Sequence, residues 1–249
     1  MPSFGNSRLP DQGIVLIFKS TFFFLFFLFF LFFLFVFNMR TPDEIHARQQ
    51  QFCNSYSFSR HKEYTPKMKA WESAINVSVK TRGCPVYSSN AENREAAVFF
   101  WMVELETLGE KYKHDKQTKE QFIQDVFTLQ DNINNSNYKS CFQNNHIRLG
   151  QCQKSLSVFL KWMWCQNELA HIPPVCPIDR QVLQKCYTVL RRSKKGSKRE
   201  LHDCGTAWTM LDDRGLYCNL IAITEKVADL ENEPSTAVWE LFAFREPEK

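Results

Sequence analysis

Six cationic side chains lie within a stretch of nine residues, and their type and spacing point most directly to a ligand. They are Arg191, Arg192, Lys194, Lys195, Lys198 and Arg199. The formal net charge is +4, so the rest of the chain is slightly acidic once these six charges are set aside. Clustered cations can neutralise several phosphates, which favours nucleic acid as the partner of residues 191–199. The alternative is a solvated surface loop beside the C-terminus of a helix, where the helix dipole alone favours cations.

The cysteine and histidine residues form no pattern typical of a metal site or a catalytic thiol. The nine cysteines are spaced ten or more residues apart, so no Cys-x-x-Cys pair is present to close on a zinc ion. Cys204 follows His202, and Cys176 follows His171 by five residues, but neither pair has a third group to orient it. We therefore expect no metal and no cofactor, and we interpret the cysteines as free, mostly buried thiols in a reducing compartment.

A second pattern lies between residues 146 and 183. It comprises His146-Ile147-Arg148-Leu149-Gly150, Lys154-Ser155-Leu156-Ser157-Val158-Phe159-Leu160 and Pro177-Ile178-Asp179-Arg180-Gln181-Val182-Leu183. This segment resembles the central part of the helix-hairpin-helix DNA glycosylases, in which a glycine turn leads to a helix with a lysine, followed by a Pro-Val-Asp type of helix start. The resemblance implies that Lys154 attacks the sugar carbon of a flipped-out nucleotide as an amine nucleophile. It also implies that Asp179 stabilises the developing positive charge.

The same residues have a structural interpretation that stays open. The segment has a single turn glycine, Gly150, and a long connection before Asp179 that carries tryptophans and prolines. In this interpretation Pro177 begins a helix, the charge of Asp179 complements the helix dipole, and Lys154 is solvated. The tryptophans at positions 162, 164, 208 and 239 are interpreted as core residues, with stacking on bases as the alternative.

Residues 22–37 contain only phenylalanine, leucine and one valine. As a helix this tract would reach roughly 24 Å, short of the ~30 Å hydrocarbon core of a membrane. Because the tract has such low complexity and Met39 follows it, we interpret residues 1–38 as an untranslated or artefactual leader. The alternatives are a membrane anchor and a signal peptide. A membrane partner is expected only if residues 22–37 are expressed and inserted.

Helix-start signals and apolar stripes after the leader predict about seven helices. Capping boxes lie at residues 41–44, 89–92 and 118–121, and apolar stripes with helical spacing cover residues 122–133, 149–163, 178–190 and 216–230. A short apolar element follows at residues 238–242. We assign the continuous apolar run 96–103 to a central helix, with a buried strand as the alternative. No alternating strand pattern or hairpin signal is found.

These patterns predict an all-α, compact multi-helix domain over residues 39–249, with a boundary near 132–145 or 191–203 if it has two lobes. The first functional hypothesis is a non-enzymatic binding module that takes nucleic acid through residues 191–199. The alternatives are a glycosylase- or lyase-like enzyme acting through Lys154 and Asp179, and a protein-interaction scaffold. We expect a cytoplasmic or nuclear protein or, if the tract is an anchor, a membrane-anchored one with a cytosolic C-terminal domain.

Overall fold

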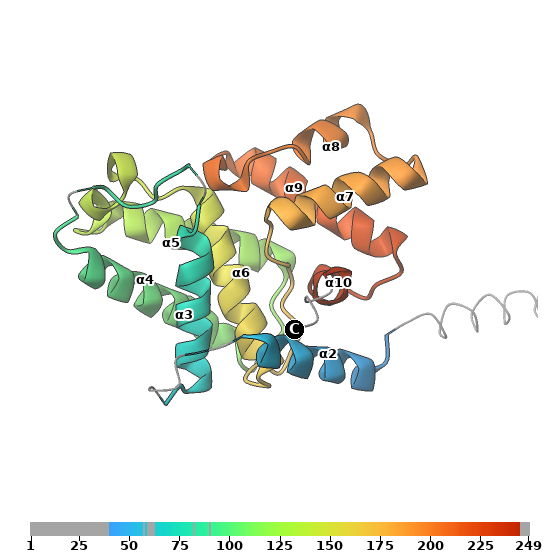
Figure 1. Cartoon of the computed structure of the whole chain (residues 1–249), viewed down its shortest axis with the longest axis horizontal. Helices are drawn as coiled ribbons and strands as arrows, with labels where there is room; N and C mark the ends of the chain where they lie inside the picture. Colours follow the sequence, from blue (N-terminus) through green and yellow to red (C-terminus); the bar gives the residue numbers. More distant parts are fainter. Residues whose placement is uncertain (1–39, 57, 59–62, 82, 90, 245–249) are drawn as a thin grey trace, which may run out of the picture. The chain divides into compact units, whose positions relative to one another are not determined.

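The computed structural model describes residues 40–244 except 57, 59–62, 82 and 90, and these residues belong to one compact unit (Figure 1). The described part of the chain contains nine α-helices and no strand, so the all-α prediction is confirmed. The helices are α2 (Pro42–Ser55), α3 (Pro66–Val79), α4 (Arg94–Gly109), α5 (Lys119–Asn135), α6 (Leu149–Cys165), α7 (Arg180–Ser193), α8 (Lys198–Asp203), α9 (Arg214–Leu230) and α10 (Thr236–Ala243). The predicted leader, residues 1–38, lies outside the described residues.

Helix α6 is the centre of the fold, because it packs against α2, α3, α4 and α5, and every one of its residues except Lys161 is buried. A helix covered on all sides must pair its polar groups internally. The buried hydroxyl of Ser155, for example, accepts a hydrogen bond of 3.0 Å from the Trp101 indole of α4. The remaining helices, α7 to α10, pack on one another, and α10 also contacts α2.

The prediction that residues 96–103 form a helix is confirmed, but the prediction that this helix is central is wrong. Helix α4 buries one face through Ala97, Trp101 and Leu105 and turns the opposite face outward, where the Phe99 side chain is 66% exposed. An unbroken apolar run does not reveal which of its residues face the core. The central position is taken by α6, several of whose buried polar side chains, such as Gln153 and Ser155, form hydrogen bonds there.

Two of the three predicted capping boxes are present. Thr41 and Thr118 each exchange hydrogen bonds with the residue three positions later, whereas α4 begins at Arg94 without a side-chain cap, so the predicted start at 89–92 is wrong. Helices α3 and α8 were not predicted. Helix α8 has a capping box of its own, formed by Ser197 and Glu200.

Gly150 is the second residue of α6 and does not form a turn between helices. A Cβ atom at this position would lie 1.9 Å from the carbonyl oxygen of Trp208. The Gly150 amide also donates a hydrogen bond of 2.8 Å to the carbonyl of Leu211. The glycine therefore lets the 3-10 turn Trp208–Met210 lie directly against the start of α6. Within the described residues, no helix combines the length and the apolar character needed to cross a membrane.

Candidate functional site

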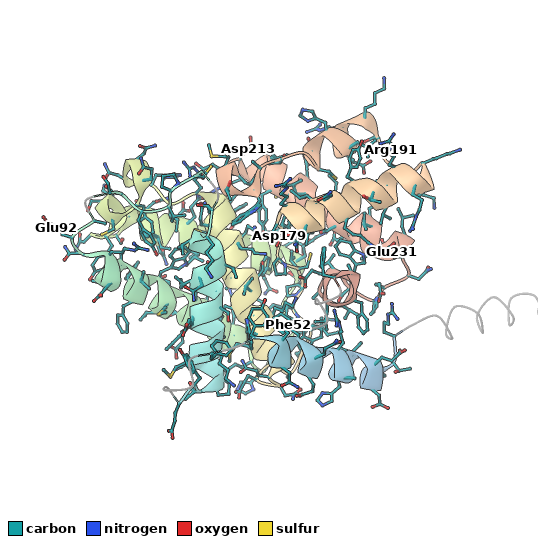
Figure 2. The ribbon with its side chains drawn as sticks, in the orientation of Figure 1. Phe52, Glu92, Asp179, Arg191, Asp213 and Glu231 are labelled. Carbon is teal, nitrogen blue, oxygen red and sulfur yellow. The ribbon has the colours of Figure 1, made fainter. Side chains whose placement is uncertain are left out.

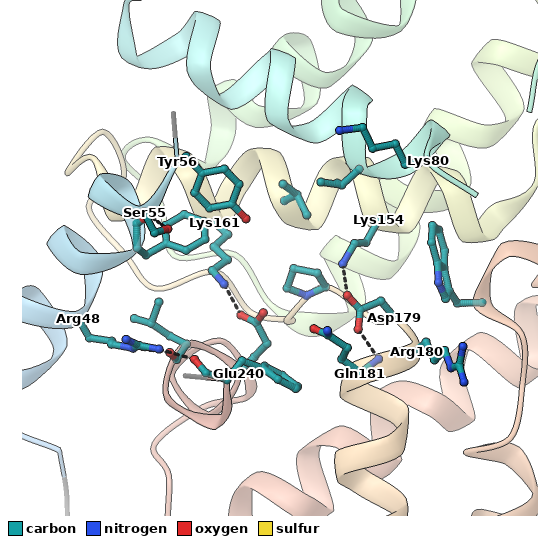
Figure 3. A pocket seen from close by; sticks show the side chains of 17 residues that line it. Arg48, Ser55, Tyr56, Lys80, Lys154, Lys161, Asp179, Arg180, Gln181 and Glu240 are labelled. Atoms are coloured by element: carbon teal, nitrogen blue, oxygen red, sulfur yellow. Dashed lines mark hydrogen bonds and ion pairs between the residues drawn. The ribbon is translucent and has the colours of Figure 1, made fainter. Parts of the chain in front are cut away.

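Lys154 and Asp179, which the sequence separates by 25 positions, meet in the structure (Figure 3). The Nζ atom of Lys154 donates a hydrogen bond of 2.6 Å to Oδ2 of Asp179. The other carboxylate oxygen, Oδ1, accepts from the backbone amides of Gln181 and Val182 and so caps the start of α7. Helix α7 therefore begins after Asp179, and Pro177 lies before the cap. Lys154 is only 8% exposed, so the interpretation of this lysine as solvated is wrong.

The charged form of Asp179 is favoured in the folded protein. Burial raises the pKa of the carboxyl group, but the Lys154 ammonium and the hydrogen bonds from Lys154, Val182 and Gln181 outweigh burial. The net result is a pKa below the ordinary value, so Asp179 is ionised at neutral pH. A buried ion pair of this kind pays a desolvation cost that a purely apolar contact would avoid. It is therefore a candidate functional group.

Gln153 fixes the relative position of Lys154 and Asp179. Its side-chain amide donates a hydrogen bond of 2.6 Å to the carbonyl of Ile178 and accepts one of 3.2 Å from the Ile178 amide. Gln153 directly precedes Lys154, and Ile178 directly precedes Asp179. The atoms that form both hydrogen bonds are buried. The approach of α6 to the start of α7 is thus set by a two-bond amide clamp. Sequence reasoning did not identify Gln153.

The ion pair lines a pocket of about 640 Å³, called the Lys154 pocket below. A second pair lies in the same pocket, where Lys161 of α6 donates a hydrogen bond of 2.7 Å to Glu240 of α10. Lys161 follows Lys154 by seven residues, or two helical turns, so both lysines project from the same face of α6. Burial lowers the pKa of Lys161, but the charge and hydrogen bond of Glu240 outweigh that effect and raise it.

Arg48 of α2 forms another part of the pocket wall. Its Nε atom donates a hydrogen bond of 2.9 Å to the carbonyl of Leu241, and its guanidinium also bonds the carbonyl of Phe244. Two further cations, Lys80 and Arg180, line the pocket and have no side-chain hydrogen bond or ion pair within the described part of the chain. Counting the described residues, the pocket therefore has five cations against two carboxylates, Asp179 and Glu240.

A second pocket, of about 850 Å³, continues from the first, since both are lined by Lys80, Arg180, Gln181 and Trp208. It is called the Trp208 groove below. Its walls come from the outward side of α7 and from residues 204–209. The other three tryptophans in question, at positions 162, 164 and 239, are buried as predicted. Trp208 is only partly buried, so the prediction that it is a core residue is wrong, and its side chain is accessible to a ligand in the groove.

The six predicted nucleic-acid-binding cations are all exposed, but they do not form one loop. Arg191 and Arg192 belong to α7, Lys194 and Lys195 to the following turn, and Lys198 and Arg199 to α8. Two of them have carboxylate neighbours, with N to O distances of 3.1 Å between Arg192 and Glu231 and 3.9 Å between Arg199 and Asp203. Figure 2 shows Asp179 and Arg191 near opposite ends of α7, so one helix joins the two predicted sites.

Most cysteine thiols of the described residues are buried. All nine cysteines are free and six are buried. Burial, together with the nearby carboxylates of Asp203 and Glu200, raises the pKa of Cys204 to about 11, which disfavours the reactive thiolate. Within the described ranges, no cluster of three or more histidine, cysteine, aspartate or glutamate side chains is arranged to hold a metal ion. Comparison with protein-family models, curated proteins and solved structures finds no match to this chain.

Proposed function

We propose that this protein acts on DNA as a glycosylase or abasic-site lyase in which Lys154 is the amine nucleophile. The observation that carries the proposal is the contact of Lys154 with Asp179 in a pocket rich in cations. The pocket volume of about 640 Å³ is within the usual range for small-molecule sites, roughly 300–1,000 Å³. Its surplus of positive charge favours a phosphate-bearing ligand, and a flipped-out nucleotide is such a ligand.

The ion pair supplies the proton transfer that an amine nucleophile requires. A lysine ammonium has no free electron pair, so it must first lose a proton. Oδ2 of Asp179 is 2.6 Å from Nζ and can accept that proton only transiently, because the pKa of this carboxyl group is lowered, while Oδ1 keeps its bonds to the α7 amides. Asp179 thus remains in place whether it is charged or neutral. The Gln153 clamp keeps the donor and acceptor within hydrogen-bond distance.

At an abasic site the reaction begins at the C1′ aldehyde of the opened sugar. The neutral Nζ forms a bond to C1′, and the carbonyl oxygen takes up two protons and leaves as water, which gives a protonated Schiff base. Loss of a C2′ proton then forms a C2′–C3′ double bond, and the C3′–O bond breaks with its electron pair on the phosphate oxygen. With an intact nucleotide, Nζ displaces the base from C1′, and the base leaves with the glycosidic electron pair and takes up a proton. Neither sequence requires an oxidant or reductant.

Borohydride trapping tests the proposal, because it reduces the Schiff base to a stable amine. The full-length chain should form a covalent adduct with a duplex that contains an abasic site. Lys154→Arg keeps a cation opposite Asp179 but cannot form a Schiff base, so the adduct should disappear. Lys161→Arg is the matched control, since Lys161 is a second paired lysine of the same helix and pocket. This variant keeps Lys154 and should still form the adduct. An adduct that survives Lys154→Arg, or no adduct with the native chain, refutes the proposal.

A non-enzymatic nucleic-acid-binding module is the second candidate, and the exposure of all six cations of residues 191–199 favours it. Neutralising several phosphates makes binding steeply dependent on salt. If native protein binds duplex DNA in low salt without forming an adduct, and if glutamine at the six positions abolishes that binding, the binding module is favoured. If neither binding nor an adduct is found, a protein-interaction scaffold is left.

A further inference from the structure

We infer that the outward face of α7 guides a DNA strand from the Lys154 pocket to the cations of residues 191–199. The inference rests on the proposed action on DNA and adds the path of the substrate strand. Arg180, Gln184, Tyr187 and Arg191 follow one another at spacings of four, three and four residues, and all four side chains are exposed. This spacing places them in one stripe along a helix. The opposite face of α7 is buried in the core through Val182, Leu183, Cys186, Val189 and Leu190.

The Trp208 groove has the composition expected of a surface that binds a single strand. Among the residues that the structure describes, its lining includes Lys80 and Arg180 but no aspartate or glutamate. Two partly exposed aromatic side chains, Tyr187 and Trp208, line it as well. Sequence-independent binding of single strands combines cations that contact phosphates with aromatic rings on which bases stack. Grooves that bind amphipathic helices are mainly apolar, whereas this lining combines cations with aromatic rings, which favours nucleic acid.

The length of α7 sets how far the strand extends. From Arg180 to Arg191 the helix rises by roughly 16 Å, at about 1.5 Å per residue. A stacked strand rises by about 3.4 Å per nucleotide, so this distance corresponds to about five nucleotides. Asp179 and the Lys154 pocket lie at one end of this path, and the turn with Lys194 and Lys195 follows its other end. The cations of residues 191–199 should therefore contact phosphates about five nucleotides from the nucleotide in the pocket.

Binding of single-stranded oligonucleotides to the full-length chain tests the path. Each oligonucleotide carries one tetrahydrofuran residue, an abasic analogue without the C1′ oxygen, so no Schiff base forms. The strand is lengthened by one nucleotide at a time on either the 5′ or the 3′ side of the analogue. We expect affinity to rise with length on one side only and to level off after about five nucleotides. The slope of log affinity against log salt should steepen by about 0.7 for each added phosphate that pairs with a cation of this path.

Substitutions locate the strand on α7. Arg191→Gln combined with Lys194→Gln should remove the gain from the outermost nucleotides, whereas Lys116→Gln, an exposed cation outside both pockets, should leave it unchanged. Tyr187→Leu or Trp208→Leu should weaken binding by roughly 10-fold through lost stacking. Tyr187→Phe, which keeps a ring, should bind like the native chain. Circular dichroism of each variant confirms that its helices are intact.

The outcomes separate this inference from the proposed function. Affinity that does not depend on strand length, depends equally on both sides, or falls equally in the Lys116→Gln control overturns the path along α7. Borohydride trapping with a short abasic oligonucleotide reports the Lys154 chemistry independently. An adduct without length dependence therefore refutes the path alone. One-sided length dependence without an adduct supports the path and refutes the chemistry.

Discussion

Asp179 should contribute to stability through two separable interactions, a cap on α7 and the charge that compensates buried Lys154. Asp179→Asn keeps an N-cap oxygen but removes the charge, because asparagine and aspartate cap helices about equally well. Removing one partner of a buried ion pair costs about 3–5 kcal/mol. The Lys154 and Asp179 side chains are 10% and 25% exposed, which places this pair near the lower limit, at about 3 kcal/mol. Asp179→Ala also removes the cap, worth about 1 kcal/mol, for a total of about 4 kcal/mol.

A double-mutant cycle with Lys154→Met isolates the ion pair. Lys154→Met should cost less, about 1–2 kcal/mol, because Asp179 keeps its two amide donors and its partial exposure. In the double variant no buried charge is left unpaired. Its loss of unfolding free energy should therefore be about 2–3 kcal/mol smaller than the sum of the losses in the two single variants. Urea unfolding followed by circular dichroism gives the four free energies of unfolding. Additive costs, or an Asp179→Asn cost below about 0.5 kcal/mol, would refute the assignment of a compensated buried charge.

Three further predictions concern the same region. The pKa of Asp179 is lower in the folded chain than its ordinary value of 3.8. Ionised Asp179 therefore stabilises the fold at pH values above 3.8, and this stabilisation is lost as the pH falls through the lower pKa of the folded chain. The stability difference between native chain and Asp179→Asn should therefore shrink on acidification below about pH 4, as measured by urea unfolding at several pH values. Gly150→Ala should lower the free energy of unfolding by about 2 kcal/mol or more, since its Cβ would overlap the Trp208 carbonyl, and should change the Trp208 fluorescence. Ser197→Ala should cost about 1 kcal/mol in thermal unfolding, because it removes the α8 capping box, while Ser197→Thr should cost little.

The helices that the sequence predicted are those whose signals are local. Thr41 and Thr118 cap helices through hydrogen bonds to residues three positions away, so a short stretch of sequence contains the whole interaction. The same signal was present at Ser197 and Glu200, but the surrounding cations suggested a loop. The rest could not be predicted in this way. Only tertiary packing decides that α4 exposes Phe99 while α6 is enclosed.

The sequence likewise predicted only part of the candidate site. The lysine and the aspartate came from a resemblance over residues 146–183, and the structure brings them together, although their catalytic role stays a prediction. Lys161 and Glu240 were missed, although the sequence contains a signal for each of them. Lys161 follows Lys154 at helical spacing, and Glu240 is a single acid within an apolar run. Their pairing across 79 positions depends on the path of the chain, which local patterns do not contain.

The bonds from Arg48 to α10 have a consequence for how the protein matures. Arg48 and Leu241 are 193 positions apart, and they join the first and last of the described helices beside the pocket. Contacts between such distant parts of a chain form late, because a long loop must close before they stabilise anything. Helices α2 to α6 can associate while synthesis continues, but Glu240 reaches Lys161 only once α10 has been made. The pocket wall is therefore among the last parts to assemble, and a polypeptide truncated before α10 would carry Lys154 and Asp179 without the side of the pocket that Glu240 and Leu241 form.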